Sequence, residues 1–418
     1  MRREMTARQS VVAATIGNVL EWYDFAIYAY AATTIGKKFF PGADEVASML
    51  AVFATFGVGF VIRPVGGIVI GRIGDRKGRK AALLLTILLM ALGTVGIGVL
   101  PDHQAIGSLA PTLLVVCRLL QGLAAGGEWG SSTAFIVEWA PAGRRGFFGS
   151  LQQAGVSGGL LLGSVTTALL NIFLTPGQLA SWGWRIPFVA GALLVPVGLY
   201  MRRNIEEPPA LDGLRALPSD NSVRTGLRRA TKACGFTALW TVAYYMMLSY
   251  MPTFTQQFAG LSASQALGSN AFGLVILVAS TPVFGALSDK IGRKPLLLIS
   301  CISFILFSYP LFLILVSKAT LTAVILVQMA FSLMIALFSG PGPAAIAEIF
   351  PPSNRATWMS AGYSMAVAMF GGFAPYIASR LIGFTGSPLA PTLYLIAAAC
   401  VSAIVTAGLR ETAHDGGS

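Results

Sequence analysis

Long apolar runs, separated by short breaks that are charged or rich in proline and glycine, fill most of this 418-residue sequence. Hydrophobic residues make up 55% of the chain and charged residues only 11%, whereas about a quarter of the residues in an ordinary soluble protein are charged. Apolar runs of about 20 residues are long enough to cross a bilayer as helices. The runs are continuous, unlike the alternating strands of a membrane barrel. We therefore predict an all-α polytopic membrane protein.

The breaks divide the chain into 12 predicted spans, six before and six after one long hydrophilic interval. That interval, residues 202–232, contains bases, acids and prolines, and reads as a cytoplasmic linker. We therefore predict two six-helix halves, residues 1–201 and residues 233–418, with the linker between them. The predicted spans are residues 11–36, 46–71, 81–100, 111–139, 146–173, 185–201, 233–258, 265–287, 295–317, 320–349, 357–382 and 391–409.

Basic residues are concentrated on one side of the predicted membrane. If the N-terminus is inside, most of the 29 Lys and Arg fall in cytoplasmic segments. The outer loops and their borders hold only Lys37, Lys38, Arg185, Lys318 and Arg380. This is the positive-inside pattern, and it places both termini in the cytoplasm of a multi-pass inner-membrane protein. The lipid bilayer accounts for the net charge of +12, so we expect no nucleic-acid partner.

Two short motifs each occur twice, about half the chain apart. The sequence GRIGDRKGRK returns as GALSDKIGRK, with glycine, aspartate, arginine and lysine at the same spacing. In a second motif, WAPAGR is flanked by Glu138 and Arg145, and IFPPSN is flanked by Glu348 and Arg355. Because both motifs repeat at nearly one offset, the sequence indicates a doubled unit. Parallel repeats of this kind are found in secondary transporters.

These motifs resemble those of a known superfamily. GRIGDRKGRK resembles the loop signature of the major facilitator superfamily, and RLLQGLAAG resembles its fourth-helix motif. More narrowly, GNVLEWYDF, RPVGG, QGLAAGGEWG and WGWRIPF resemble the metabolite:proton symporter family. That family includes importers of citrate, 2-oxoglutarate, shikimate, and proline or betaine. The resemblance covers both halves and implies the major facilitator fold, in which two pseudo-symmetric halves give alternating access to a central site.

The resemblance also implies a gate built from the repeated motifs. The loop motif would lock the two halves together when the transporter faces outward, and the Glu/Arg pairs would be matching charge relays. Positive-inside anchoring alone would explain the Lys and Arg, but not the repeated aspartate, glycine and glutamate. The predicted gating residues are Gly71, Asp75, Arg76, Gly78, Arg79, Glu138, Arg145, Asp289, Gly292, Arg293, Glu348 and Arg355.

Ionisable side chains are rare within the predicted spans. Each costs about 2.5–3.5 kcal/mol on insertion scales, so each needs a cavity or a partner. In the first span, Glu21, Asp24 and Tyr28 follow one another at helical spacing on a single face. In the fourth span, a polar stripe within an arc of about 80° contains Arg118, Gln121, Ala125, Glu128 and Ser132.

Proton binding in the spans has to use carboxylates, because His103 lies in an outer loop and His414 in the C-terminal tail. Burial disfavours an ionised carboxyl, whereas a nearby guanidinium favours it, so alternating access can load and release a proton. We predict proton coupling at Asp24, Glu21 and Glu128, with Arg118 as charge partner or substrate-anion clamp. The alternative is a permanent Glu–Arg pair that only fixes helix packing.

Polar and aromatic side chains of both halves are the candidate ligands for a substrate. Arg63 is a weaker candidate than Arg118, since it can also snorkel or join a structural network. In the second half the candidates are aromatic or amide groups, each of which can equally serve packing. The predicted substrate-binding residues are Arg118, Gln121, Tyr28, Arg63, Tyr244, Tyr245, Gln328 and Tyr363.

We therefore expect a secondary active transporter that imports a small carboxylate together with protons. One alternative is a zwitterion symporter of the proline/betaine type, or an uncoupled facilitator. Members that sense osmolarity carry a long C-terminal extension, and the short segment after Leu409 makes that type less expected. A more remote alternative is a nutrient sensor that does not transport.

Enzymatic activity is not expected, because the sequence has no phosphate-cradling glycine–lysine loop and no His/Cys cluster. The four cysteines stand singly in apolar runs, with no spacing typical of a disulfide or a metal site. We therefore expect no cofactor or metal. A monomer is expected, with the substrate, protons and lipid as partners.

Overall fold

The chain is helical almost throughout the residues that the structure, a computed structural model, describes. These are residues 7–42, 44–67, 69–70, 79–126, 128–141, 143–191, 196, 223–317, 320–350, 355–411 and 413. Over this part of the chain there is no strand. The continuous apolar runs thus predict the fold class correctly.

The first half contains long helices joined by short loop helices. Over the described residues the long helices follow the predicted spans, with interruptions after Tyr30 and Val61, and the sixth predicted span, residues 185–201, is described only in part. The elements are α1 (Ala7–Tyr30), α2 (Ala32–Phe39), α3 (Glu45–Val61), α5 (Arg79–Val99), α6 (His103–Ile106), α7 (Leu109–Ala125), α8 (Glu128–Trp139), α9 (Arg145–Phe173), α10 (Pro176–Ser181) and η1 (Gly183–Arg185).

The second half begins with a helix that starts at Val223, so residues 223–232 of the predicted linker are already helical. Two of its spans contain a π-helical segment in their middle, η2 and η3. The elements are α13 (Val223–Ala243), η2 (Tyr244–Tyr250), α14 (Met251–Phe258), α15 (Ala263–Ile291), α16 (Arg293–Val316), α17 (Leu321–Ser339), α18 (Gly342–Glu348), α19 (Arg355–Ala366), η3 (Val367–Gly371), α20 (Ala374–Thr385) and α21 (Pro391–Ala407).

Helix length and surface chemistry both match a bilayer. Among the described residues, seven helices are long and apolar enough to cross a membrane. Large apolar side chains point outward from the bundle: Phe173 is 77% exposed, Phe384 84% and Ile404 74%. Surfaces of this kind are stable in lipid, where exposed apolar groups cost nothing, and the chain is a multi-pass membrane protein.

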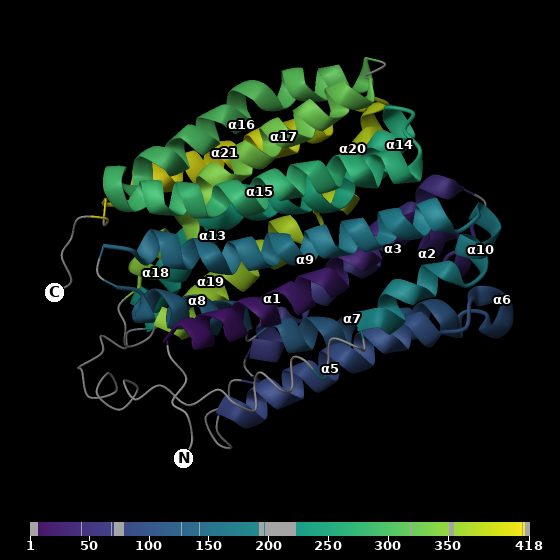
Figure 1. Cartoon of the computed structure of the whole chain (residues 1–418), viewed down its shortest axis with the longest axis horizontal. Helices are drawn as coiled ribbons and strands as arrows, with labels where there is room; N and C mark the ends of the chain where they lie inside the picture. The colour runs from purple at the N-terminus through teal and green to yellow at the C-terminus, as the bar shows by residue number, and fades with distance from the viewer. Residues whose placement is uncertain are drawn as a thin grey trace.

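The helices form two layers (Figure 1). Helices α15, α16, α17 and α21 lie in one layer, and α1, α5, α7 and α9 lie in the other. At the boundary, α9 of the first half packs along α15 of the second. Helix α1 begins and α21 ends at the same end of the bundle, on the left in Figure 1, whereas α6, α10 and α14 lie at the opposite end.

The predicted fourth span is described in two parts. Residues 111–139 form α7 and α8, and residue 127 between them lies outside the described residues. A Cβ atom added to Gly126 would clash with the carbonyl oxygen of Arg63, so the chain needs a glycine where α7 ends against its neighbour. The prediction that Arg118 and Glu128 share one face of a single helix stays a prediction, because residue 127 lies outside the described residues.

Candidate functional site

Helix α7 crosses the segment containing α3 in direct backbone contact, because glycines stand where they meet. A Cβ atom added to Gly122 would clash with the carbonyl oxygen of Gly59. One added to Gly66 would clash with that of Leu123. Larger residues would push the two helices apart, so this crossing holds two intramembrane arginines, Arg63 and Arg118, in one region.

Arg118 is completely buried and surrounded by aromatic rings. Its guanidinium carbon lies 4.4 Å from the ring centre of Tyr28, 4.9 Å from Phe25 and 5.0 Å from Phe56. Its Nη1 donates to Oε1 of Gln121 at 2.7 Å. Its Nε has no hydrogen-bond partner among the described residues. A buried guanidinium with an unused donor is able to accept an anionic group.

Arg63 also lies over the ring of Phe25. Its guanidinium carbon lies 4.9 Å from the ring centre of Phe25 and 4.5 Å from that of Phe60. Its Nη2 pairs with Oε1 of Glu21 at 3.5 Å, and both side chains are buried. Its Nε, like that of Arg118, has no partner in the part of the chain that is described. The two guanidinium groups therefore contact one ring.

Asp24 does not form an ion pair with Arg118, although both were predicted for one region. Its Oδ2 instead accepts a hydrogen bond from Oγ1 of Thr94 at 2.7 Å. Gln121 donates from Nε2 to the same Thr94 oxygen at 2.8 Å. Arg118 thus reaches Asp24 through two neutral side chains, in a network contributed by α1, α5 and α7.

An aromatic cluster from both halves lies next to the arginines. Tyr245 of η2 has its ring centre 5.8 Å from Trp22 and 5.0 Å from Phe60, and its buried hydroxyl has no partner among the described groups. Tyr363 of α19 stacks on Trp129 of α8 with centroids 3.5 Å apart. π-Helical segments such as η2 occur frequently at functional sites. The rings bring second-half residues to the first-half charges.

The remaining predicted ligands have mixed positions. Tyr244 shares a hydrogen bond of 2.9 Å with Ser157 of α9, so it also bridges the halves. Gln328 donates to Ser269 at 2.8 Å, which uses its amide between α17 and α15 within the second half. Glu128 is half-buried at the first residue of α8.

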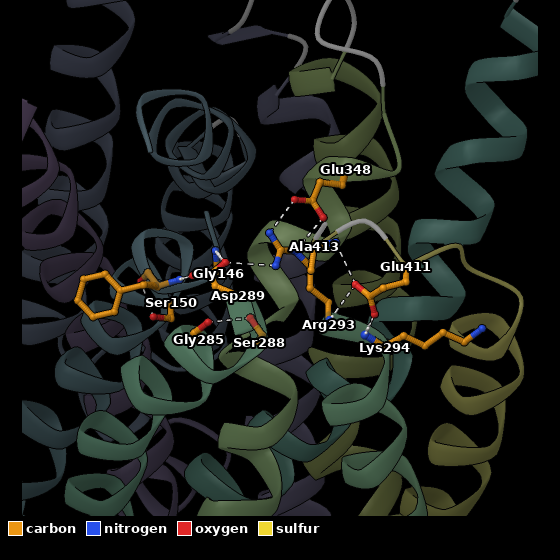
Figure 2. Close-up of polar contacts among 11 residues, drawn as sticks. Gly146, Ser150, Gly285, Ser288, Asp289, Arg293, Lys294, Glu348, Glu411 and Ala413 are labelled. Atoms are coloured by element: carbon orange, nitrogen blue, oxygen red, sulfur yellow. Dashed lines mark hydrogen bonds and ion pairs between the residues drawn. The ribbon is translucent and has the colours of Figure 1, made fainter. Parts of the chain in front are cut away.

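Asp289 joins the two halves at the end of the bundle where α1 begins (Figure 2). Its carboxylate accepts the backbone N–H of Gly146 at 2.8 Å and that of Phe147 at 2.9 Å. These N–H groups belong to the first turn of α9, where a negative charge is favourable. The backbones also touch closely, since a Cβ atom on Gly146 would lie 2.6 Å from the carbonyl oxygen of Gly285.

Arg293 extends this junction within the second half. Its guanidinium donates to both oxygens of Glu348, at 2.8 and 2.9 Å, and pairs with Asp289 at 3.3 Å. Gly292 precedes it with φ of 101°, a backbone conformation that favours glycine. Glu411, beyond α21, accepts the backbone N–H of Arg293 at 2.9 Å. The second copy of the repeated motif is therefore an ordered ionic network.

The first copy of the motif is mostly outside the described residues. Gly71, Asp75, Arg76 and Gly78 lie outside them entirely. Among the other predicted gating residues, Arg145 is the half-buried first residue of α9. Arg79, Glu138 and Arg355 belong to helices α5, α8 and α19, and their side chains are outside the described part.

Sequence comparison places the chain in a known group. The family model described as "Major Facilitator Superfamily" matches residues 14–339 and 269–416. The chain belongs to the Major Facilitator Superfamily. It is accordingly a membrane transporter rather than an enzyme, which agrees with the expectation from the repeated loop motifs.

Three relatives within this superfamily cover nearly the whole chain. The proline/betaine transporter of Escherichia coli (strain K12) is 32% identical, over 97% of this chain and 84% of its own. The putative proline/betaine transporter of Staphylococcus aureus (strain COL) is 35% identical, over 96% and 87%. The glycine betaine/proline/ectoine/pipecolic acid transporter OusA of Dickeya dadantii (strain 3937) is 32% identical, over 97% and 84%.

Solved structures of sugar symporters share the fold of this superfamily member. The proton:xylose symporter XylE from the major facilitator superfamily, bound to 6-bromo-6-deoxy-D-glucose, aligns with a TM-score of 0.78 at 18% identity, over 97% of this chain and 96% of its own. A D-xylose-proton symporter aligns with a TM-score of 0.75 at 19% identity, over 96% of each chain. These likenesses support the two-half, 12-helix fold.

Sequence reasoning missed several residues of the site, among them Thr94, Phe25 and Trp129. Thr94 is one of two threonines in an otherwise apolar predicted span, and Trp129 follows Glu128 within QGLAAGGEWG. These two features are the only signals in the sequence that could have pointed to Thr94 and Trp129. Phe25 looks like any apolar residue of a helix, so only the positions of Arg63 and Arg118 reveal its role.

Proposed function

We propose that the chain is a proton-coupled transporter of a zwitterion of the proline/betaine type. The carboxylate substrate expected from the sequence is not supported, because the relatives found are named for proline, betaine, ectoine and pipecolic acid. They favour the zwitterion alternative. The lower expectation for a proline/betaine type, based on the short segment after Leu409, has no support from them either.

The geometry supports a substrate with one negative and one positive end. Arg63 and Arg118 each have an unused Nε donor in a buried site, which suits a carboxylate. The faces of Trp22, Tyr245 and Tyr363 provide negative π-density, which suits a cationic nitrogen. Buried guanidinium groups next to an aromatic cluster are the observation that carries this proposal. A carboxylate without a cationic nitrogen would use the guanidinium groups but not the aromatic rings.

Asp24 and Glu21 are the proposed proton-binding groups. Both are buried in α1, and each is linked to an arginine: Glu21 directly to Arg63, and Asp24 indirectly to Arg118. A zwitterion carries no net charge across the membrane. The proton that crosses with it carries one positive charge, and its movement down the proton gradient drives accumulation of the zwitterion. Glu128, half-buried at the first residue of α8, is the third proposed proton-binding group.

The Asp289 junction is proposed as one side of the gate. We place it at the cytoplasmic end of an inner-membrane protein, with the linker and both chain ends on the same side. Since Asp289 ties α15 of one half to α9 of the other, the site opens to this side only if these hydrogen bonds break. The contact supports a role in alternating access between the halves.

Uptake by proteoliposomes tests this function. Labelled proline and glycine betaine are offered with an imposed inward proton gradient, with no gradient, and with a protonophore. We expect accumulation above the external concentration only with the gradient, inhibited by unlabelled zwitterions and not by citrate. Equal uptake with and without the gradient would favour the uncoupled facilitator. Binding without uptake would favour the sensor.

A further inference from the structure

Three hydrogen bonds connect Arg118 to Asp24 in a single direction. Arg118 donates to Gln121 at 2.7 Å, Gln121 donates to Thr94 at 2.8 Å, and Thr94 donates to Asp24 at 2.7 Å. All four side chains are buried. Within the described residues, no direct ion pair joins the two ends. Among the described residues, the guanidinium and the carboxylate are therefore connected through an amide and a hydroxyl.

The chemistry of the two ends fixes the direction of this chain. A guanidinium can only donate, so the Gln121 atom facing Arg118 is the carbonyl oxygen. The amide nitrogen of Gln121 is then left to donate to Thr94. The hydroxyl of Thr94 has one hydrogen, and an ionised Asp24 can only accept it. Thr94 is consequently the donor that stabilises the ionised form of Asp24.

Close packing holds the chain in place. A Cβ atom on Gly93 of α5 would lie 2.6 Å from Cγ of Gln121, so a glycine beside Thr94 lets α5 approach α7. On the other side, a Cβ atom on Gly191 would lie 3.1 Å from Oδ1 of Asp24 and 3.0 Å from Cγ2 of Thr94. Thr94 and Asp24 therefore have little space to rearrange while the neighbouring residues stay in position.

We infer that Thr94 is the positioning residue that couples substrate binding at Arg118 to protonation of Asp24. This inference rests on the proposed proton-coupled transport. When a substrate carboxylate draws the N–H groups of Arg118 away, Gln121 loses its charged donor. Hydrogen bonds in a chain polarise one another, so the bond from Thr94 to Asp24 weakens as well. The neutral form of Asp24 is then favoured over the ionised form, so substrate and proton bind together.

The proton does not travel along the chain. Asp24 takes it from water on one side of the membrane and returns it to water on the other, while Arg118 stays charged throughout. By linkage, protonation of Asp24 strengthens substrate binding by the same factor. Besides Arg118, Tyr23 on α1 interacts electrostatically with Asp24, and Glu21 and Tyr28 stand three and four residues away on the same helix.

Valine in place of Thr94 removes the hydroxyl and keeps the shape. We compare T94V with T94S, which keeps the hydroxyl. T167V is the matched control, because Thr167 is a buried threonine whose hydroxyl donates to the Gly163 carbonyl of its own helix. Two quantities are measured in proteoliposomes: accumulation of labelled betaine driven by a proton gradient, and exchange of labelled for unlabelled betaine without a gradient.

The ratio of accumulation to exchange should fall about tenfold in T94V, the size expected for one hydrogen bond to a charged group. It should stay near the wild-type value in T94S and T167V. A T94V protein with the wild-type ratio would overturn the inference. Equal losses of both activities would also overturn it, since Thr94 would then only support the structure. Absent betaine transport by the wild type would instead refute the proposed function.

An infrared measurement on the purified protein tests the same bond without any substrate. The carbonyl stretch of protonated Asp24 is identified as the band that D24N lacks. This band should shift in T94V and keep its position in T94S and T167V, since its frequency depends on the hydrogen bond from Thr94. An unchanged band in T94V would contradict the inference even if betaine is not the substrate.

Discussion

The carboxylate of Asp289 accepts the backbone N–H of Gly146 at 2.8 Å, so the last turn of α15 caps the first turn of α9. In D289N the shape is kept and the charge that favours this helix end is lost. We expect turnover to fall severalfold, while the dissociation constant for substrate changes by less than about twofold. Transport kinetics and equilibrium binding measure the two quantities.

D44N is the matched control for D289N. Asp44 also accepts a backbone N–H at a helix start, that of Val46 at 3.0 Å, but it caps α3 within one half. Its replacement should leave turnover unchanged. A large loss of affinity in D289N with normal turnover would contradict the role of Asp289 as a gate.

Gly146 should tolerate no side chain while this end is closed. A methyl group there would lie 2.6 Å from the Gly285 carbonyl oxygen, so G146A should hold the halves apart. Labelling of a cysteine placed at the buried Ser150 should become faster than in the parent protein. G158A is the control, because its nearest neighbour would lie 3.8 Å away. Equal labelling rates in all three proteins would refute the prediction.

Arg118 should not be replaceable by lysine. Lysine keeps the charge but loses the planar set of donors, including the bond to Gln121. We expect R118K to weaken betaine binding at least about tenfold, as measured by calorimetry. R185K is the comparison variant, since Arg185 donates to backbone carbonyls of Ser181 and Leu100 outside the cluster. Wild-type affinity in R118K would argue against a carboxylate site there.

The ring of Tyr363 should matter more than its hydroxyl. It stacks on Trp129 within the aromatic cluster, where a desolvated cation–π contact is worth about 2 kcal/mol. Y363L should therefore raise the KM for glycine betaine by about tenfold, whereas Y363F should stay close to wild type. The KM for glycine betaine of each variant is measured from uptake kinetics. If Y363F were as impaired as Y363L, the hydroxyl and not the ring would be the functional group.

Apolar run length was sufficient to predict the fold, because a helix is the simplest way to satisfy backbone hydrogen bonds in lipid. It was also sufficient to select Asp24 and Arg118 as site candidates, since buried charges in spans are rare. The link between them was not predictable. Gln121 and Thr94 meet only because α5 and α7 approach at Gly93, and that register depends on tertiary packing.

The position of Glu128 relative to Arg118 stays a prediction. Helical periodicity placed it on the polar stripe of Arg118, which assumed an unbroken helix. Gly126 stands where a Cβ atom would clash with the Arg63 carbonyl, so the chain packs closely against its neighbour there, and residue 127 lies outside the described residues. A glycine inside an apolar run is ambiguous in the sequence, because it serves close packing and helix breaks alike.

The central claim is that a zwitterion and a proton cross together. The most direct test measures external pH in a weakly buffered suspension of proteoliposomes while betaine is added without any imposed gradient. The account predicts alkalinisation that begins with betaine entry, is absent with citrate and is lost in D24N. Betaine entry with no change of external pH would contradict it.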